Sequence, residues 1–313
     1  MNDDARRARV LTLVDPSVGR GLEVGPSFSP FVRKSSGADV CVVDHLSTDA
    51  LREKYSGHGV DAAGIEPVDI VWNGGSLADA CLERGPFDYV IASHVLEHIA
   101  DPLRFLADCE SLLSPGGIVS LVLPDHRLCF DYFRPPTTIG QWVDARFDAR
   151  SIHTPGTVLD HWVHAVQRGA IQWSAETTDP LTMVHVRADV DDAFATACAA
   201  QEYVDVHAWV FHPASFRFLI DMARSFDFIT LEIAYAHDTV GCEFYVSLRR
   251  PLPDAPAADR DGPFETRLAQ LRVVRAAVDA GTPAPLTVAP NRSVARSVLS
   301  AARRAPRRVR RIR

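Results

Sequence analysis

The segment Gly-Leu-Glu-Val-Gly-Pro-Ser at residues 21–27 decides the fold, together with Val-Cys-Val-Val-Asp at residues 40–44. A glycine where a strand turns into a helix lets the backbone approach a ligand closely, because glycine has no side chain. An acid at the tip of the next parallel strand can accept hydrogen bonds from both hydroxyls of a ribose. The pair therefore predicts a nucleoside-containing ligand at the carboxyl ends of two parallel strands.

Three further segments extend this pattern. They are Phe-Asp-Tyr-Val-Ile-Ala-Ser-His-Val-Leu-Glu-His at residues 87–98, Leu-Leu-Ser-Pro-Gly-Gly at 112–117 and Ile-Val-Ser-Leu-Val-Leu-Pro-Asp at 118–125. With them, residues 19–250 resemble the class I S-adenosylmethionine-dependent methyltransferases, in which a Val-Leu-Glu-His-like segment commonly ends the fourth strand. The resemblance implies an α/β fold with a doubly wound, mostly parallel seven-stranded sheet, and S-adenosylmethionine as the cofactor.

The resemblance also implies roles for individual residues. Glu23 and Gly25 stand where the first motif meets the methionine part of the cofactor, and Asp44 stands where the ribose is held. Asn73 falls where an acid usually meets the adenine amino group, and its amide oxygen can still accept from that amine. The full set of expected cofactor residues is Glu23, Gly25, Pro26, Asp44, His45, Asn73, Ser93 and His94.

A dinucleotide cofactor fits the same residues less well. A dinucleotide site needs G-x-G-x-x-G, which lets a helix N-terminus reach a pyrophosphate. Residues 25–30 read Gly-Pro-Ser-Phe-Ser-Pro instead. S-adenosylmethionine carries no phosphate, so the missing glycines favour it over NAD.

Alternating strand and helix signals run through most of the chain. Expected strands cover residues 20–24, 39–43, 68–72, 87–92 and 117–123, with stretches between them long enough for crossover helices. Helices are expected at 101–114, where Asp-Pro gives an N-cap and first turn, and at 213–226. A hairpin of strands 229–236 and 243–248, with a turn at 237–241, is expected to complete the sheet.

The domain organisation follows from these elements. We expect a methyltransferase domain over residues 1–250, with an inserted substrate-cover segment at about 126–212 that holds seven of the twelve histidines. Loops at the carboxyl ends of parallel strands form the ligand crevice, which makes this insertion the natural cover. A linker at 251–263 and a short helix at 264–280 precede an arginine-rich tail that ends at residue 313.

Composition narrows the setting of the protein. The chain has no run of eighteen apolar residues and no basic-then-apolar start, so we expect a cytoplasmic protein. Six cysteines are scattered without a C-x-x-C pair, which is typical of reduced cysteines rather than disulfides or zinc ligands. The body of the chain is acidic, which argues against a nucleic-acid partner.

Methyl transfer to an oxygen requires a group that removes the hydroxyl proton. Candidate bases must follow strands that face the cofactor, which selects His94 after the fourth strand and Asp125 with His126 after the fifth. His161 in the insertion follows an aspartate and is a further candidate. Arg127 and Arg134 are interpreted as solvated surface charges.

The sequence favours a site without a metal. The acids Asp189, Asp191 and Asp192 read as the first turn of a helix, because acids stabilise helix N-termini. The histidines lack H-x-x-x-H or H-x-E spacing, although dispersed ligands could converge in three dimensions.

The sequence thus predicts a methyltransferase that acts on a hydroxyl of a polar small molecule or a glycan. Two other interpretations stay open. One is a natural-product or lipid-like acceptor, and the other is a non-catalytic cofactor-binding module whose basic tail recruits a partner. The oligomeric state is left open.

The tail generates a first prediction. Residues 292–313 carry nine arginines and no acid, and arginines gain about 1 kcal/mol each near anionic lipid. The full chain should therefore sediment with phosphatidylglycerol vesicles at low salt, and truncation after residue 290 should abolish binding. Equal sedimentation of the two proteins would instead make the tail a solvated extension.

Overall fold

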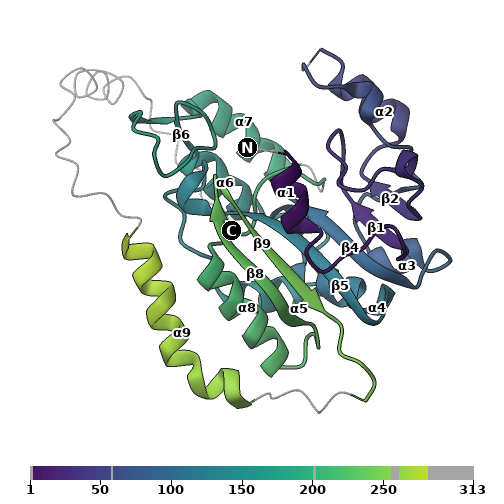
Figure 1. Ribbon diagram of the computed structural model, residues 1–313. Coiled ribbons are helices and arrows are strands. Elements are labelled where there is room, and N and C mark those ends of the chain that lie inside the picture. Colours follow the sequence, from purple (N-terminus) through teal and green to yellow (C-terminus); the bar gives the residue numbers. More distant parts are fainter. Residues whose placement is uncertain (1–2, 58, 200–201, 255–260, 281–313) are drawn as a thin grey trace, which may run out of the picture.

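The computed structural model describes residues 3–57, 59–199, 202–254 and 261–280 (Figure 1). A seven-stranded sheet with the order β3-β2-β1-β4-β5-β9-β8 forms its centre. Strands β1 to β5 are parallel, β9 runs antiparallel to β5, and β8 runs antiparallel to β9. The expected doubly wound methyltransferase fold is confirmed. The strands are β1 (Gly21–Val24), β2 (Val40–Asp44), β3 (Ile70–Val71), β4 (Phe87–Ser93), β5 (Leu113–Pro124), β8 (Glu232–Val240) and β9 (Glu243–Arg249).

Helices and short turns connect the strands and cover both faces of the sheet. The α-helices are α1 (Asp3–Val10), α2 (Thr48–Tyr55), α3 (Leu77–Cys81), α4 (Pro102–Leu112), α5 (Ile139–Phe147), α6 (Pro155–His164), α7 (Arg187–Ala199), α8 (Pro213–Ser225) and α9 (Asp261–Ala280). Two of the 3-10 turns matter below, η3 (Leu96–His98) and η4 (His126–Leu128). A small antiparallel pair, β6 (Val166–Arg168) and β7 (Leu181–Met183), lies outside the main sheet.

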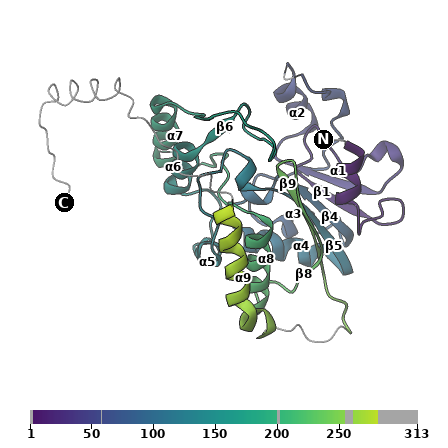
Figure 2. The ribbon, with the colours of Figure 1, turned by 60° about the vertical axis from the view of Figure 1, so that its left-hand side comes forward.

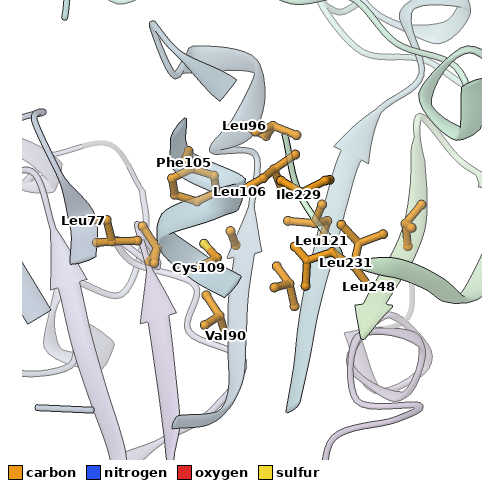
Figure 3. Close-up of a cluster of buried hydrophobic side chains, with 14 of the residues drawn as sticks. Leu77, Val90, Leu96, Phe105, Leu106, Cys109, Leu121, Ile229, Leu231 and Leu248 are labelled. Carbon is orange, nitrogen blue, oxygen red and sulfur yellow. The ribbon is translucent and has the colours of Figure 1, made fainter. Parts of the chain in front are cut away.

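The sheet separates two apolar clusters. On one face, Phe105, Leu106 and Cys109 of α4 lie over Val90 and Leu121 of the central strands (Figure 3). On the other face, α1 lies against β5 and β9 (Figure 1). Truncating a fully buried leucine to alanine typically costs about 2–5 kcal/mol, so these clusters fix the positions of the strand ends.

Local sequence explains where α4 begins. The Asp101 carboxylate accepts a hydrogen bond from the backbone N–H of Arg104, and Pro102 occupies the first helical position. Proline is favoured there because its missing N–H would have no partner within the helix. The expected helix start is confirmed.

The insertion contains more regular structure than its sequence pattern indicated. Helices α6 and α7 pack against each other at the end of the molecule that also holds β6 (Figures 1 and 2). Its return segment is tied to the sheet region, because the backbone N–H of Ala208 donates to the Glu97 carbonyl at 2.7 Å. The N–H of Thr137 donates to the Val210 carbonyl at 2.9 Å. These bonds bring residues from both ends of the insertion close to η3.

Several elements differ from the expectation in their bounds, among them β5, which starts at Leu113 rather than at residue 117. The expected turn at residues 237–241 is too long, because β8 continues to Val240 and pairs with Glu243 of β9. The register shifts between His237 and Val240, so the polar residues of the expected turn lie in an irregular part of the strand. Helix α9 starts at Asp261, three residues before the expected position.

Three further sequence predictions concern the cysteines, membrane-spanning helices and the C-terminal tail. The six cysteines are free thiols, four of them buried, as expected. No helix among the described residues is long and apolar enough to cross a membrane. The arginine-rich tail and part of the expected linker lie outside the described residues.

Candidate functional site

A cavity of about 620 Å³ opens at the carboxyl ends of the parallel strands. Its position follows from the register, because Val24 of β1 pairs with both Val43 and Ala92. The residues just after these three positions therefore lie at one edge of the sheet, where the strand order reverses and ligands bind in such folds. Of the expected cofactor residues, five line this cavity, namely Gly25, Asp44, His45, Asn73 and His94.

The two halves of the sequence motif meet at Asp44. Its Oδ2 accepts a hydrogen bond from the Ser27 backbone N–H at 2.9 Å, and its Oδ1 accepts one from the His45 backbone N–H at 2.8 Å. Oδ1 also lies 2.6 Å from Nδ1 of His45, so Oδ2, with its second lone pair, is the oxygen that can accept from a ribose hydroxyl. Gly25 has a φ of 65°, and a Cβ added there would lie 3.0 Å from Cγ2 of Val95. The residues therefore fit a nucleoside that passes close to the backbone.

Glu23 does not line the cavity, contrary to the expected contact with the methionine part. Its buried carboxylate accepts hydrogen bonds from the backbone N–H groups of Phe31 and Val32, at 2.7 and 3.1 Å. Burial raises the pKa of Glu23 to about 7, although these two bonds oppose the rise. Side chains alternate along a strand, so Glu23 points to the face opposite Leu22 and Val24. It shapes the loop after β1.

Two other expected cofactor residues also lie outside the cavity lining. Pro26 belongs to the loop after β1, where its carbonyl accepts from the backbone N–H of Ser29 at 2.8 Å. The Ser93 hydroxyl accepts a hydrogen bond from Nη2 of Arg6 at 3.1 Å, so it serves the packing of α1.

His94 lies at the cavity wall between two carboxylates. Its Nδ1 lies 3.1 Å from Oε1 of Glu97, and its Nε2 lies 2.7 Å from Oε1 of Glu243. Burial alone would lower the pKa of His94, but the hydrogen bonds to Glu243 and Glu97 outweigh it and raise the pKa to about 9. The imidazole is therefore charged at neutral pH with both nitrogens engaged, which makes it unsuited to the expected role of general base.

The network continues into α1. Arg6 donates from Nε to Oε2 of Glu243 at 2.8 Å and from Nη2 to Oε1 at 2.9 Å. Burial alone would raise the pKa of Glu243, but His94 and Arg6 lower it to about 2. A carboxylate shared by two cations in this way holds α1, β9 and the end of β4 together.

Asp125 and His126 lie away from the cavity, contrary to the expectation for the acceptor side. Ser93 pairs with Val122, and β5 then continues to Pro124, which carries both residues past the end of β4. Asp125 accepts hydrogen bonds from Nε and Nη2 of Arg127 at 2.8 and 2.6 Å, so Arg127 is paired rather than freely solvated.

His126 lines a second cavity instead, and the centroid of its ring lies 5.8 Å from that of His212. Burial lowers the pKa of His126.

His161 also lies outside the cavity lining. It belongs to α6, and its Nδ1 accepts a hydrogen bond from the His207 backbone N–H at 3.3 Å. Burial lowers the pKa of His161 to about 3. The imidazole is neutral and holds the return segment of the insertion.

Sequence reasoning missed three other residues of the cavity lining. His98, Tyr203 and Asp205 line it, and Nδ1 of His98 lies 2.8 Å from Oδ1 of Asp205. The Tyr203 hydroxyl donates to the His98 carbonyl at 3.1 Å. Burial would lower the pKa of His98, but Asp205 and Glu97 outweigh it and raise the pKa. The Glu97-His98 pair within the quoted motif was the available signal, whereas Asp205 gave none.

Comparisons with known proteins identify the family of the chain. A family model described as a methyltransferase domain matches residues 4–169, more than half of the chain. The chain therefore belongs to this methyltransferase family, and S-adenosylmethionine is the cofactor of the site.

Curated relatives are similar over part of their length. The ubiquinone biosynthesis O-methyltransferase of Caulobacter vibrioides is 57% identical over 129 residues, which are 40% of this chain and 46% of that protein. The enzyme of the same name from Cereibacter sphaeroides is 34% identical over 113 residues, or 35% and 39% of the two chains. The chain thus spans less than half the length of these relatives. A solved methyltransferase from Streptomyces caelestis matches with a TM-score of 0.41 and 13% identity, over 80% of this chain and 96% of that one.

The position of Asp44 generates a prediction about cofactor affinity. Asp44→Ala removes the carboxylate at the ribose position, and hydrogen bonds to charged groups are worth about 1.5–3 kcal/mol. Affinity for S-adenosylmethionine, measured by calorimetry, should fall at least about tenfold. Asp49→Ala on α2 removes an aspartate that is 98% exposed and should leave the affinity unchanged. Unchanged affinity in a folded Asp44→Ala protein would show that the ribose does not bind at Asp44.

The His94 network generates a prediction about stability. Because the folded-state pKa is raised, the stabilisation is complete below pH 6.5, the ordinary value, and is lost as the pH rises through about 9. At about 1.4 kcal/mol per unit of pKa, the raised pKa of His94 contributes about 3 kcal/mol to the free energy of unfolding. Urea unfolding should show that loss in the native chain and not in His94→Gln. Parallel curves for the two proteins across this range would contradict the ion pairing.

Proposed function

We propose that the protein transfers a methyl group from S-adenosylmethionine to a hydroxyl oxygen of a small acceptor, either a polar molecule or a glycan unit. The observation that carries the proposal is one cavity that is lined both by Asp44, at the expected ribose position, and by an acid–base pair, His98 and Asp205. The O-methyltransferase names of the curated relatives support oxygen as the acceptor atom.

The cofactor, when bound, supplies an electrophilic methyl group on a sulfonium. The protein's part is to hold the acceptor in line with that group and to exclude water, because proximity and orientation lower the barrier. The apolar side chains Trp72 and Phe105 line the cavity, with ring centroids 6.2 Å apart in a stacked arrangement. They give a flat ring system an apolar wall.

The hydroxyl proton needs an acceptor on the protein. His94 is charged, and Asp125, His126 and His161 lie elsewhere. His45 lines the cavity too, but its ring contacts Asp44 at the expected ribose position, which leaves His98 as the best-placed imidazole. Its Nδ1 faces Asp205, so its Nε2 is the nitrogen that would take the proton. Because the pKa of His98 is raised, turnover should increase with pH as the imidazole loses its proton.

A pair of variants tests this assignment. His98→Gln should lower turnover about 100-fold, measured as transfer of labelled methyl to a panel of phenols, sugars and polyols, and should keep cofactor affinity. His126→Gln is the matched control and should stay within about threefold of the native chain. The assignment to His98 fails if the folded His126→Gln protein loses activity and His98→Gln keeps it.

The cofactor and the acceptor are tested separately. Absence of S-adenosylmethionine binding would overturn the whole proposal. Binding without methyl transfer to any acceptor would favour the non-catalytic module, and transfer only to lipid-like phenols would replace the polar acceptor.

A further inference from the structure

Three side chains from distant parts of the chain converge at the wall of the cavity. One ligand atom each from Glu97, His98 and His207 lies within 4.8 Å of the other two. Glu97 and His98 belong to η3, and His207 comes from the return segment of the insertion. We propose that these residues bind a divalent first-row transition metal ion, although the sequence pattern had favoured a site without a metal.

Both histidines are oriented as metal ligands are. Nδ1 of His98 lies 2.8 Å from Oδ1 of Asp205, and Nδ1 of His207 lies 2.6 Å from Oδ2 of Asp131. Metal-binding histidines usually donate one ring N–H to a carboxylate, which fixes the tautomer and leaves the other nitrogen for the ion. The recorded hydrogen bonds of both rings fall on Nδ1, so both Nε2 atoms remain for the ion.

Glu97 supplies an independent observation. Its side chain is fully buried, and Oε1 is engaged by His94. Its Oε2 is buried and has no hydrogen-bond partner within the described part of the chain. A buried carboxylate oxygen without a partner costs free energy, and a cation in front of it removes that cost.

The backbone around the three residues is fixed before any ion binds. The Ala208 N–H donates to the Glu97 carbonyl at 2.7 Å, which sets His207 beside η3. Arg134 donates from Nη1 both to Oδ1 of Asp131 and to the His207 carbonyl, each at 2.7 Å. Arg134 is therefore a buried structural cation, contrary to its interpretation as a solvated charge.

The donor set selects the class of ion. Two imidazoles and one carboxylate suit zinc, manganese or ferrous iron better than calcium or magnesium, which prefer oxygen ligands. Tetrahedral zinc with bonds of about 2.1 Å holds its ligand atoms about 3.4 Å apart, so atoms that lie within 4.8 Å of one another need to close by up to about 1.4 Å. Three protein ligands leave a coordination position open, as in catalytic zinc sites.

The open position would serve the methyl transfer, and this part rests on the proposed function. His98 lines the cavity, so an ion on its Nε2 lies at the acceptor side. There it would lower the pKa of the acceptor hydroxyl as a Lewis acid. With an ion on its Nε2, His98 acts as a ligand instead of as the base. The oxygen–hydrogen bond then breaks with release of its proton to water, the oxygen–methyl bond forms, and the sulfonium–methyl bond breaks.

Calorimetry with Zn²⁺ on the chelator-treated full chain tests the site directly. We expect one tight site, weakened at least about 10- to 100-fold by Glu97→Gln and by His98→Gln, since loss of even an orienting carboxylate costs that much. Asp131→Asn and Asp205→Asn test this orienting role and should weaken binding by about the same range. Co²⁺ bound to the native chain should give visible absorption bands that His98→Gln lacks.

Two controls separate this site from surface binding of Zn²⁺. His164→Gln removes a partly exposed histidine whose Nδ1 bonds to the Asp160 carbonyl in its own helix, and it should leave the tight site intact. His98 is partly exposed, so its variant should fold even if Glu97→Gln does not. The proposal is overturned if the native chain binds no Zn²⁺ tightly, or if folded His98→Gln binds it as well as the native chain does.

The metal and the methyl transfer can fail independently. Full methyl transfer by a chelator-treated chain that binds no Zn²⁺ would leave the proposed function standing with His98 as the direct base. Tight Zn²⁺ binding in a chain that does not bind S-adenosylmethionine would leave the ion site and remove the proposed function.

Discussion

The buried ion pairs of Glu243 with Arg6 and His94 hold the site together. Arg6 comes from α1, His94 follows β4, and Glu243 begins β9, so one carboxylate joins three elements at the cavity edge. Removing one partner from such a network leaves an uncompensated buried charge, which typically costs about 3–5 kcal/mol. The network also carries Glu97, because His94 bridges Glu243 to it. The ion pairs that join α1, β4 and β9 therefore also position Glu97 on the acceptor side.

Carboxylate partners decide what each histidine near the cavity can do. His94 has two and is held as a cation, whereas His98 has one hydrogen-bonded carboxylate, Asp205, and keeps a nitrogen for chemistry. His161 has no carboxylate partner among its recorded hydrogen bonds in the described residues, and burial keeps it neutral. The same side chain thus serves as a structural cation, a candidate base or ligand, and a hydrogen-bond acceptor, according to its neighbours.

The insertion contributes more than a cover. Its return segment brings Asp205 and His207 to η3, and Asp131 with Arg134 holds that segment from the other end of the insertion. The nucleoside end of the cavity comes from β1, β2 and β3, while the opposite wall combines β4 with the insertion. This division allows the acceptor wall to change without altering the cofactor end.

The sequence by itself determined the sheet and the nucleoside end, because both depend on local signals. Apolar runs of strand length, the Asp101-Pro102 helix start and the Gly25 and Asp44 positions each act within a few residues. Glu23 lies outside the cavity lining because alternation along β1 turns it to the other face. Only the tertiary structure decided the acceptor wall. His98 contacts Asp205, which lies 107 residues further along the chain. Asp125 lies past the cavity because of the register of β5 with β9. Neither a contact over such a sequence separation nor a strand register can be read from the local sequence pattern.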